Sequence, residues 1–159
     1  MNLKEAQQIA EKVREVLLPY CDRIQIAGSI RRARPTVHDI DIVLIENPEA
    51  ALIISSALAS IGVIKLNGSK IKRLHYHKAN IDIDIYFATP TTWPTLLLIR
   101  TGSKESNIRL ATRAKRMGWQ LKANGDGLFN ENGERVAGDT EESIYRALGV
   151  SYQMPNERD

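Results

Sequence analysis

The sequence predicts an α+β protein in two parts, in which a mixed sheet with flanking helices is followed by a smaller α+β lobe. Three observations predict this class. Segments with helical spacing of apolar residues alternate with short strand-like segments, and residues 80–87 alternate strictly. A chain of 159 residues with 43% hydrophobic content can bury one good core or two small ones. After Pro90 and Pro94 the pattern changes, so we expect parts spanning 1–89 and 90–159.

The first part begins with an amphipathic helix over 3–18, where apolar residues recur at helical spacing and Pro19 ends the helix. Residues 23–29 and 38–46 are expected to form neighbouring strands joined by a polar turn. A helix over 50–61 follows, since Pro48 suits its first turn and Gly62 its end.

A hairpin and one more strand complete the predicted sheet. Asn67-Gly68 lies between the strand-like segments 63–64 and 71–77, which is a strong hairpin signal. Over 80–87, isoleucines occupy one face while aspartates and a tyrosine occupy the other.

The second part combines helices with short strands. Its predicted elements are helices over 95–100 and 104–117, a break at 101–103, strands over 119–122 and 127–130, a turn at 132–133, and a last helix ending at Gly149. Either Asp139 or Thr140 would cap that last helix, and Glu142 fits a capping box with Asp139.

Cysteine content and the chain start indicate an intracellular protein that is not secreted. Cys21 is the single cysteine and cannot form an internal bridge, and residues 1–5 do not read as a secretory leader. The apolar run 96–99 is interrupted by Arg100, so we expect no membrane helix. We expect a soluble monomer.

The positive charge is unevenly distributed. The net charge is only +3, but five basic and no acidic residues lie between Lys65 and Lys78. Seven basic residues lie between Arg100 and Lys122, against Glu105 alone. Such runs suit an anionic polymer, although an ordinary solvated face is an equally open reading of charge alone.

The strand over 38–46 carries two carboxylates on one face. Asp39 and Asp41 are two residues apart, so both point the same way while Ile40 and Ile42 enter the core. Adjacent like charges on a half-buried strand are costly unless a cation lies between them, and carboxylate oxygens favour Mg²⁺ or Mn²⁺. If the strand over 80–87 pairs beside it, a third aspartate converges on a two-metal site for phosphoryl transfer. An Asp-x-Asp pair alone would be weak evidence.

A polar segment before these aspartates strengthens the interpretation. Gly28-Ser29 stands at the end of the preceding strand, and Arg31-Arg32 follows. Glycine permits close approach of a phosphate, a serine hydroxyl can donate to it, and arginine offers a planar fork. A turn and a solvated bend remain the ordinary readings of either feature by itself.

These motifs resemble the nucleotidyltransferase superfamily and, within it, the family X DNA polymerases of the polymerase beta type. The block 28–32 with Asp39-Ile40-Asp41 is similar to the palm motif of that family. Residues 101–107 resemble the block that opens its thumb, and 127–129 and 144–149 resemble its last hairpin and helix. The similarity covers nearly the whole chain, and it implies a palm at 1–89 and a thumb at 90–159.

The resemblance implies a DNA-directed DNA polymerase that fills short gaps in DNA repair and uses nucleoside triphosphates with two Mg²⁺ ions, Mn²⁺ also being accepted. It selects Asp84 over Asp82 as the third metal ligand, 17 residues before Thr101, and it makes Asp39, Asp41 and Asp84 the catalytic residues. The implied nucleotide-binding residues are Gly28, Ser29, Arg32, His38, Thr101, Gly102 and Asn107.

We further expect contacts with a DNA primer and template, or a gapped duplex, from the basic segments. The candidates are Lys70, Lys72, Arg73, Lys104, Arg109, Arg113 and Arg116. The last three share one helical face, so their contribution should weaken with salt. We see no counterpart of the lyase domain or of the helix-hairpin-helix fingers, as in the compact viral members of the family.

Two departures concern the nucleotide. His38 stands where the best known member of the family has a glycine, and Ile99-Arg100 replaces the aromatic pair that excludes ribonucleotides. We therefore hypothesise weak exclusion of ribonucleotides, which a strong deoxynucleotide preference would contradict. His75 and His77 share a strand face, and ordinary surface histidines are a better reading of them than a metal site.

Two other functions remain open from the sequence. One is a template-independent, RNA-directed or protein-directed nucleotidyltransferase, which the thumb-like block disfavours. The other is a noncatalytic nucleic-acid-binding module, which the three aspartates disfavour.

Overall fold

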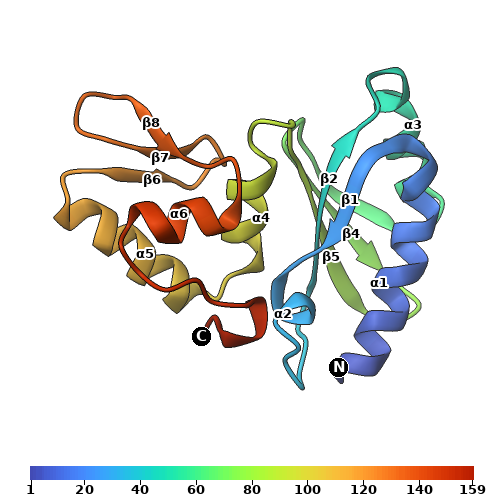
Figure 1. Cartoon of the computed structure of the whole chain (residues 1–159). Coiled ribbons are helices and arrows are strands. Elements are labelled where there is room, and N and C mark those ends of the chain that lie inside the picture. Colours follow the sequence, from blue (N-terminus) through green and yellow to red (C-terminus); the bar gives the residue numbers. More distant parts are fainter.

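The computed structural model describes the backbone of residues 1–159 and the side chains of 1–50 and 52–159. A five-stranded sheet with its helices forms one lobe, and a three-stranded sheet with helices forms the other (Figure 1). Helix α4 lies between the two sheets. The α+β class predicted from the sequence is confirmed.

The five strands are ordered β1-β2-β5-β4-β3. Their bounds are β1 Cys21–Ile26, β2 Ile40–Glu46, β3 Val63–Asn67, β4 Ile71–Tyr76 and β5 Ile81–Phe87. Strands β2 and β5 are parallel while the other neighbours are antiparallel, so the sheet is mixed. The predicted hairpin is the β3–β4 pair, in which Asn67 is the last residue of β3, opposite Lys72, and Gly68 begins the turn.

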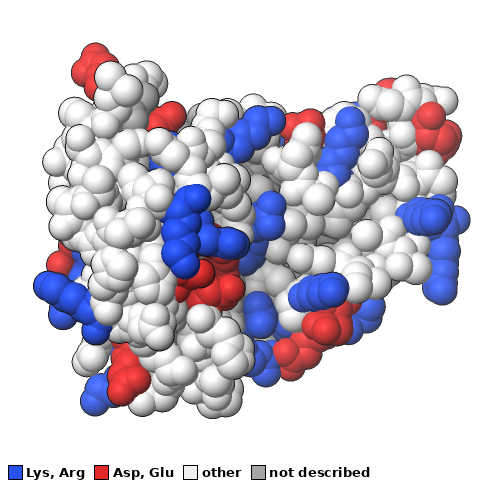
Figure 2. Space-filling model, turned by 180° about the vertical axis from the view of Figure 1, so that it is seen from behind, with Lys and Arg blue, Asp and Glu red and all other residues white. Residues whose placement is uncertain are grey.

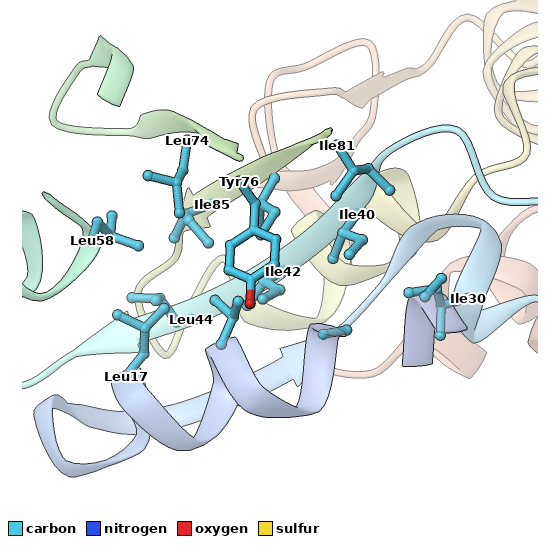
Figure 3. Packing of buried hydrophobic residues seen from close by; sticks show 14 of the residues in the cluster. Leu17, Ile30, Ile40, Ile42, Leu44, Leu58, Leu74, Tyr76, Ile81 and Ile85 are labelled. Carbon is cyan, nitrogen blue, oxygen red and sulfur yellow. The ribbon is translucent and has the colours of Figure 1, made fainter. Parts of the chain in front are cut away.

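Helices α1 (Leu3–Leu17) and α3 (Ala51–Ala59) cover one face of this sheet. The α1 N-terminus is capped by Asn2, whose side-chain oxygen accepts from the Glu5 amide at 2.9 Å. Apolar side chains from alternate strand positions fill the space beneath the helices (Figure 3); examples are Ile40, Ile42, Leu44, Leu74, Ile81 and Ile85. Because side chains alternate along a strand, the aspartates of β2 and β5 point to the opposite face.

That opposite face is partly covered by α4 (Trp93–Thr101), which packs against β2. Val43 and Tyr86 of the sheet meet Trp93, Leu96 and Leu97 of the helix in a second apolar cluster. The uncovered part of this face therefore lies on the same side of the sheet as the second lobe (Figure 1).

The second lobe has a core of its own around Leu110, Ile144 and Tyr145. Its elements are α5 (Lys104–Arg116), β6 (Gln120–Lys122), β7 (Gly127–Phe129), β8 (Arg135–Ala137) and α6 (Glu141–Ala147). The short helices η1 (Leu18–Tyr20), η2 (Pro48–Ala50) and η3 (Pro155–Glu157) complete the chain, η3 lying in the last segment beside α2 (Figure 1).

Three local features differ from the expectation, although Thr140 was one of the two expected caps of the last helix. Strand β1 ends at Ile26 rather than at 29, because Gly28–Arg31 forms the short helix α2. Strand β8 was not predicted. The α6 cap is Thr140, whose side chain accepts from the Ser143 amide at 3.0 Å, so the Asp139–Glu142 box does not form. Asp139 instead pairs with Arg135.

Candidate functional site

The parallel pairing of β2 with β5 brings the predicted carboxylates to one edge of the sheet. Asp41 is directly opposite Asp84 in the register, and Asp39 immediately precedes β2. Asp84 is 4% exposed, Asp41 is partly buried and Asp39 is exposed. Two carboxylates thus lie beside each other on neighbouring strands.

Asp41 is the most perturbed member of this group. Burial, and after it the charges of Asp39 and Asp84, raise its pKa to about 7. Arg100 and a hydrogen bond from the Tyr86 hydroxyl, 3.4 Å from Oδ1, act in the opposite direction. The three aspartates are therefore close enough for their charges to interact.

The Asp84 carboxylate forms an ion pair with an arginine. Arg73 of β4 stands opposite it in the register and donates through Nε to Oδ1 at 2.7 Å and through Nη2 to Oδ2 at 3.2 Å. Within the side chains that the structure describes, no three carboxylate, imidazole or thiol groups are close enough together to hold one metal ion. The third carboxylate is near the site but paired with Arg73.

Gly28 makes room for the Asp41 carboxylate. Its φ is +61°, a conformation that L side chains rarely adopt, and a Cβ there would lie 2.2 Å from Asp41 Oδ2. From the sequence, Gly28 was expected to permit close approach of a phosphate. In the structure, Gly28 also permits the close approach of the Asp41 carboxylate.

A cavity of about 390 Å³ brings several predicted residues together. Ser29, Arg32, His38, Asp39 and Asp41 line it, and the other lining residues are Arg34, Pro35 and Thr36. Hydroxyl, guanidinium and imidazole groups thus share one pocket with two carboxylates. This pocket is suited to an anion that also carries divalent cations.

Arg32 joins this pocket to the second lobe. Its Nη1 donates to the Thr101 carbonyl at 2.5 Å, while its buried Nε has no hydrogen-bond partner among the described residues. Gly102 has a φ of +74°, and a Cβ there would lie 2.9 Å from Arg32 Nη1. Thr101 and Gly102 are therefore neighbours of Arg32, and Gly102 also lines a second cavity.

That second cavity, also about 390 Å³, is lined mainly by apolar groups of the second lobe. Ile99, Asn107 and Ile108 are among its lining residues, together with Lys104. Asn107 Nδ2 donates to the Ile99 carbonyl at 2.8 Å, and its buried Oδ1 has no partner in the part of the chain that the structure describes. Asn107 therefore keeps an acceptor available beside an apolar cavity.

Arg100 does not point into that cavity. Its guanidinium lies over the Tyr86 ring at 4.2 Å from the centroid, on the carboxylate side of the molecule. Burial and the nearby Asp41 and Asp84 raise the pKa of Tyr86. The predicted sugar-selectivity pair is thus divided, with Ile99 at the cavity and Arg100 at the carboxylates.

An ion network that the sequence argument missed joins the two lobes. Glu141 of α6 accepts from Arg31 Nη1 and Nη2, both at 2.8 Å, and from Arg158 Nη1 at 2.9 Å. Arg31 Nη1 also donates to Thr101 Oγ1 at 2.8 Å. The side chains are 15%, 10% and 1% exposed for Arg31, Glu141 and Arg158. No local sequence pattern signals a contact across 110 residues.

The predicted DNA-contacting residues divide into two groups. The first makes contacts within the chain: Lys72 with Asn67, Arg73 with Asp84, Arg109 with the Asp159 carbonyl, and Arg113 with the Leu148 carbonyl. The second group, Lys70, Lys104 and Arg116, is exposed and makes no ion pair among the described residues. Seen from behind, basic side chains form separate groups beside acidic ones (Figure 2).

Asp82 and the two histidines lie farther along the same face. His75 Nδ1 is 2.8 Å from Asp82 Oδ1, and this hydrogen bond lowers the pKa of Asp82. His77 packs edge-on against His75, with 5.0 Å between the ring centroids. Asp82 is therefore hydrogen-bonded to His75, beside the Arg73–Asp84 pair.

Comparisons with known proteins agree with this architecture. Residues 96–159 match the family model described as DNA polymerase beta thumb. The chain is 30% identical over 158 residues to the DNA polymerase/3′-5′ exonuclease PolX of Bacillus subtilis (strain 168). That match covers 97% of this chain and 28% of the relative, so the chain spans just over a quarter of the length of that protein.

Solved structures support the fold over the whole chain. A ternary P/T complex of Leishmania infantum polymerase beta matches with a TM-score of 0.83 and 22% identity, covering 100% of this chain and 76% of the other. The ternary gap complex of the same protein matches with a TM-score of 0.83 and 20% identity, covering 100% and 70%. No helix in the described part of the chain is long and apolar enough to cross a bilayer.

Proposed function

We propose that this chain is a family X polymerase-like protein that adds deoxynucleotides to the 3′ end of a DNA primer with release of pyrophosphate. One observation carries the proposal: Ser29, Arg32, Asp39 and Asp41 line one pocket, and Asp84 stands opposite Asp41 on the paired strand. Groups that could bind a phosphate and groups that could bind a metal ion are thus adjacent, as nucleotide transfer requires.

The donor set fits hard divalent cations. Asp41 is a partly buried carboxylate whose pKa is raised by burial and by two neighbouring carboxylates, so a cation there would relieve unfavourable charge. Asp39 and Asp41 would hold two Mg²⁺ ions, with Mn²⁺ as a substitute. Asp84 would also bind a metal ion once its ion pair with Arg73 is broken. When bound, the ions would lower the pKa of the attacking 3′ hydroxyl and neutralise the triphosphate.

The other residues act through binding and orientation. Ser29 and Arg32 can donate to triphosphate oxygens, because both line the pocket and the Arg32 Nε has no partner among the described residues. His38 lines the same pocket and would lie beside the triphosphate. Asn107 would offer Oδ1 to the edge of the nucleobase, in the cavity lined by Ile99.

DNA is the proposed partner because of the thumb match and the named complexes. The family match over 96–159 is to a polymerase thumb, and the two ternary complexes belong to a polymerase beta. Lys70, Lys104 and Arg116 are the proposed phosphate contacts, since they are exposed and make no ion pair among the described residues. Short gap filling in DNA repair is the corresponding biological role.

The test is primer extension with the purified chain. A labelled primer is supplied alone, annealed to a template, and annealed across a one-nucleotide gap, with each deoxy- or ribonucleotide and Mg²⁺ or Mn²⁺. Template-matched addition supports the proposal, and untemplated addition would replace it with a tailing enzyme. Comparison of the two sugars also tests the weak exclusion of ribonucleotides expected from Ile99-Arg100.

Matched variants assign the activity to the site. Asp41→Asn should reduce extension by at least about 10³-fold, since a proposed metal ligand is lost. Asp22→Asn is the control, because Asp22 is an exposed aspartate on β1, outside the residues that line the pocket. Equal activity of Asp41→Asn and wild type would favour a noncatalytic or differently built site.

A further inference from the structure

A second arginine at the pocket of Ser29 and Arg32 was not anticipated from the sequence. Arg34 lines the same cavity as Ser29 and Arg32, and its side chain is 30% exposed. Its backbone is fixed by a hydrogen bond from the Arg34 amide to the Ser29 carbonyl at 3.0 Å. The short helix α2 and the turn after it thus place Arg34 beside the pocket.

Arg34 and Arg32 are close enough to repel each other. Burial lowers the pKa of Arg32, and the charge of Arg34 lowers it further. The buried Nε atoms of both arginines have no hydrogen-bond partner within the part of the chain described. Two neighbouring guanidinium groups with unused donors are characteristic of a site for a multiply charged anion.

The resting partner of Arg34 is weak. Arg34 Nη2 forms an ion pair with the Asp159 side chain, which is 68% exposed. It also donates to the Asn156 carbonyl at 3.5 Å, the long limit of a hydrogen bond. The charge of Asp159 also acts on Arg32. One exposed carboxylate therefore partly neutralises both pocket arginines, and exposed pairs of this kind contribute little stability.

We propose that Arg34 binds the triphosphate of the incoming nucleotide, and that Asp159 is a competing carboxylate which the triphosphate displaces. The inference rests on the proposed function, because it names a further substrate contact of the same pocket. A triphosphate carries several negative charges and many acceptor oxygens, so it can engage Arg32 and Arg34 together. The single carboxylate of Asp159 cannot match that combination.

Binding measurements test the inference without depending on turnover. Titration calorimetry with a non-hydrolysable deoxynucleoside triphosphate and Mg²⁺, and separately with inorganic tripolyphosphate, gives the Kd of each variant. Arg34→Gln should weaken both ligands by about tenfold, since a charge-assisted contact is lost. Asp159→Asn should tighten both by about two- to fivefold, since the competing charge is removed.

Opposite shifts separate this role from a structural one, because a loss of folding would weaken binding in both variants. Arg14→Gln is the control for Arg34→Gln: Arg14 is 33% exposed in an ion pair on α1. Asp139→Asn is the control for Asp159→Asn, in the exposed Arg135 pair. Both controls should leave the Kd unchanged.

Two failures would have different meanings. If the wild type binds the nucleotide and Arg34→Gln binds it equally well, the role of Arg34 is refuted while the proposed function stands. If the wild type binds neither ligand, the proposed function is refuted and this inference falls with it. A control variant that shifts the Kd as much as its test variant would also overturn the assignment.

Discussion

Glu141 should be one of the most stabilising side chains at the interface between the two lobes. It accepts three charge-assisted hydrogen bonds at 2.8–2.9 Å from Arg31 and Arg158, and Arg158 is only 1% exposed. Each pair contributes a Coulomb energy of about 4 kcal/mol at 4 Å and an effective dielectric constant of about 20, before desolvation and the repulsion between the arginines are subtracted. Glu141→Gln keeps the shape and removes the charge.

The expected loss is about 3–5 kcal/mol in the free energy of unfolding, because two poorly solvated guanidinium groups lose their carboxylate. For a chain of this size this corresponds to a Tm lower by roughly 6–20 °C. Urea unfolding with the m-value compared between variants measures it. Asp139→Asn is the control and should change the free energy by less than about 0.5 kcal/mol, since Asp139 is 90% exposed.

The pH dependence gives a second measurement on the same residue. Burial opposes ionisation of Glu141, but the hydrogen bonds and charges of Arg31 and Arg158 outweigh it, so its pKa lies below the ordinary 4.5. A lowered carboxyl pKa stabilises the folded state above about pH 4.5, and this contribution is lost as the pH falls through the folded-state pKa. The difference between wild type and Glu141→Gln should therefore narrow in acid. A loss below about 1 kcal/mol at pH 7 would refute the reasoning.

Three further predictions concern the carboxylates. Without metal, Asp41→Asn should raise the free energy of unfolding at pH 8 by on the order of 1–3 kcal/mol, because burial and two carboxylates raise the Asp41 pKa to about 7. Urea unfolding in EDTA should show that this gain shrinks as the pH falls from 7 to 4. Gly28→Ala should weaken Mn²⁺ binding at least tenfold by calorimetry, because its Cβ would lie 2.2 Å from Asp41 Oδ2, and unchanged affinity would contradict this. Arg73→Gln should tighten Mn²⁺ binding several-fold by releasing Asp84, while costing about 1–3 kcal/mol of stability; weaker binding would mean that Arg73 assists the metal site.

The main elements of the sheet could be predicted because their signals are local. The alternation over 80–87 and the Asp-x-Asp strand each identify a strand and its faces from neighbouring residues. That the two strands pair was stated only as a condition; the structure meets it, with a parallel pairing that places Asp41 opposite Asp84. The helix α2 was missed because its start depends on the φ of Gly28, which the contact with Asp41 explains only in three dimensions.

The site could be predicted by residue type but not by partner. Ser29, Arg32, His38, Asp39 and Asp41 share a pocket as the motif implied, although their roles remain predictions. The Arg73–Asp84 pair depends on the exact register of β4 against β5, which a single sequence does not fix.

The two consecutive arginines of α2 explain how the second lobe can affect the pocket. Arg31 donates to Thr101 Oγ1 and to Glu141, while Arg32 donates to the Thr101 carbonyl and lines the pocket. Thr101 is therefore an acceptor for both side chains, through different atoms. Because α4 ends at Thr101, a displacement of that end would change the position of Arg32 at the pocket and strain the Arg31–Glu141 pair together. The stability of the interface between the two lobes and the geometry of the anion site thus depend on the same few atoms of Arg31, Arg32 and Thr101.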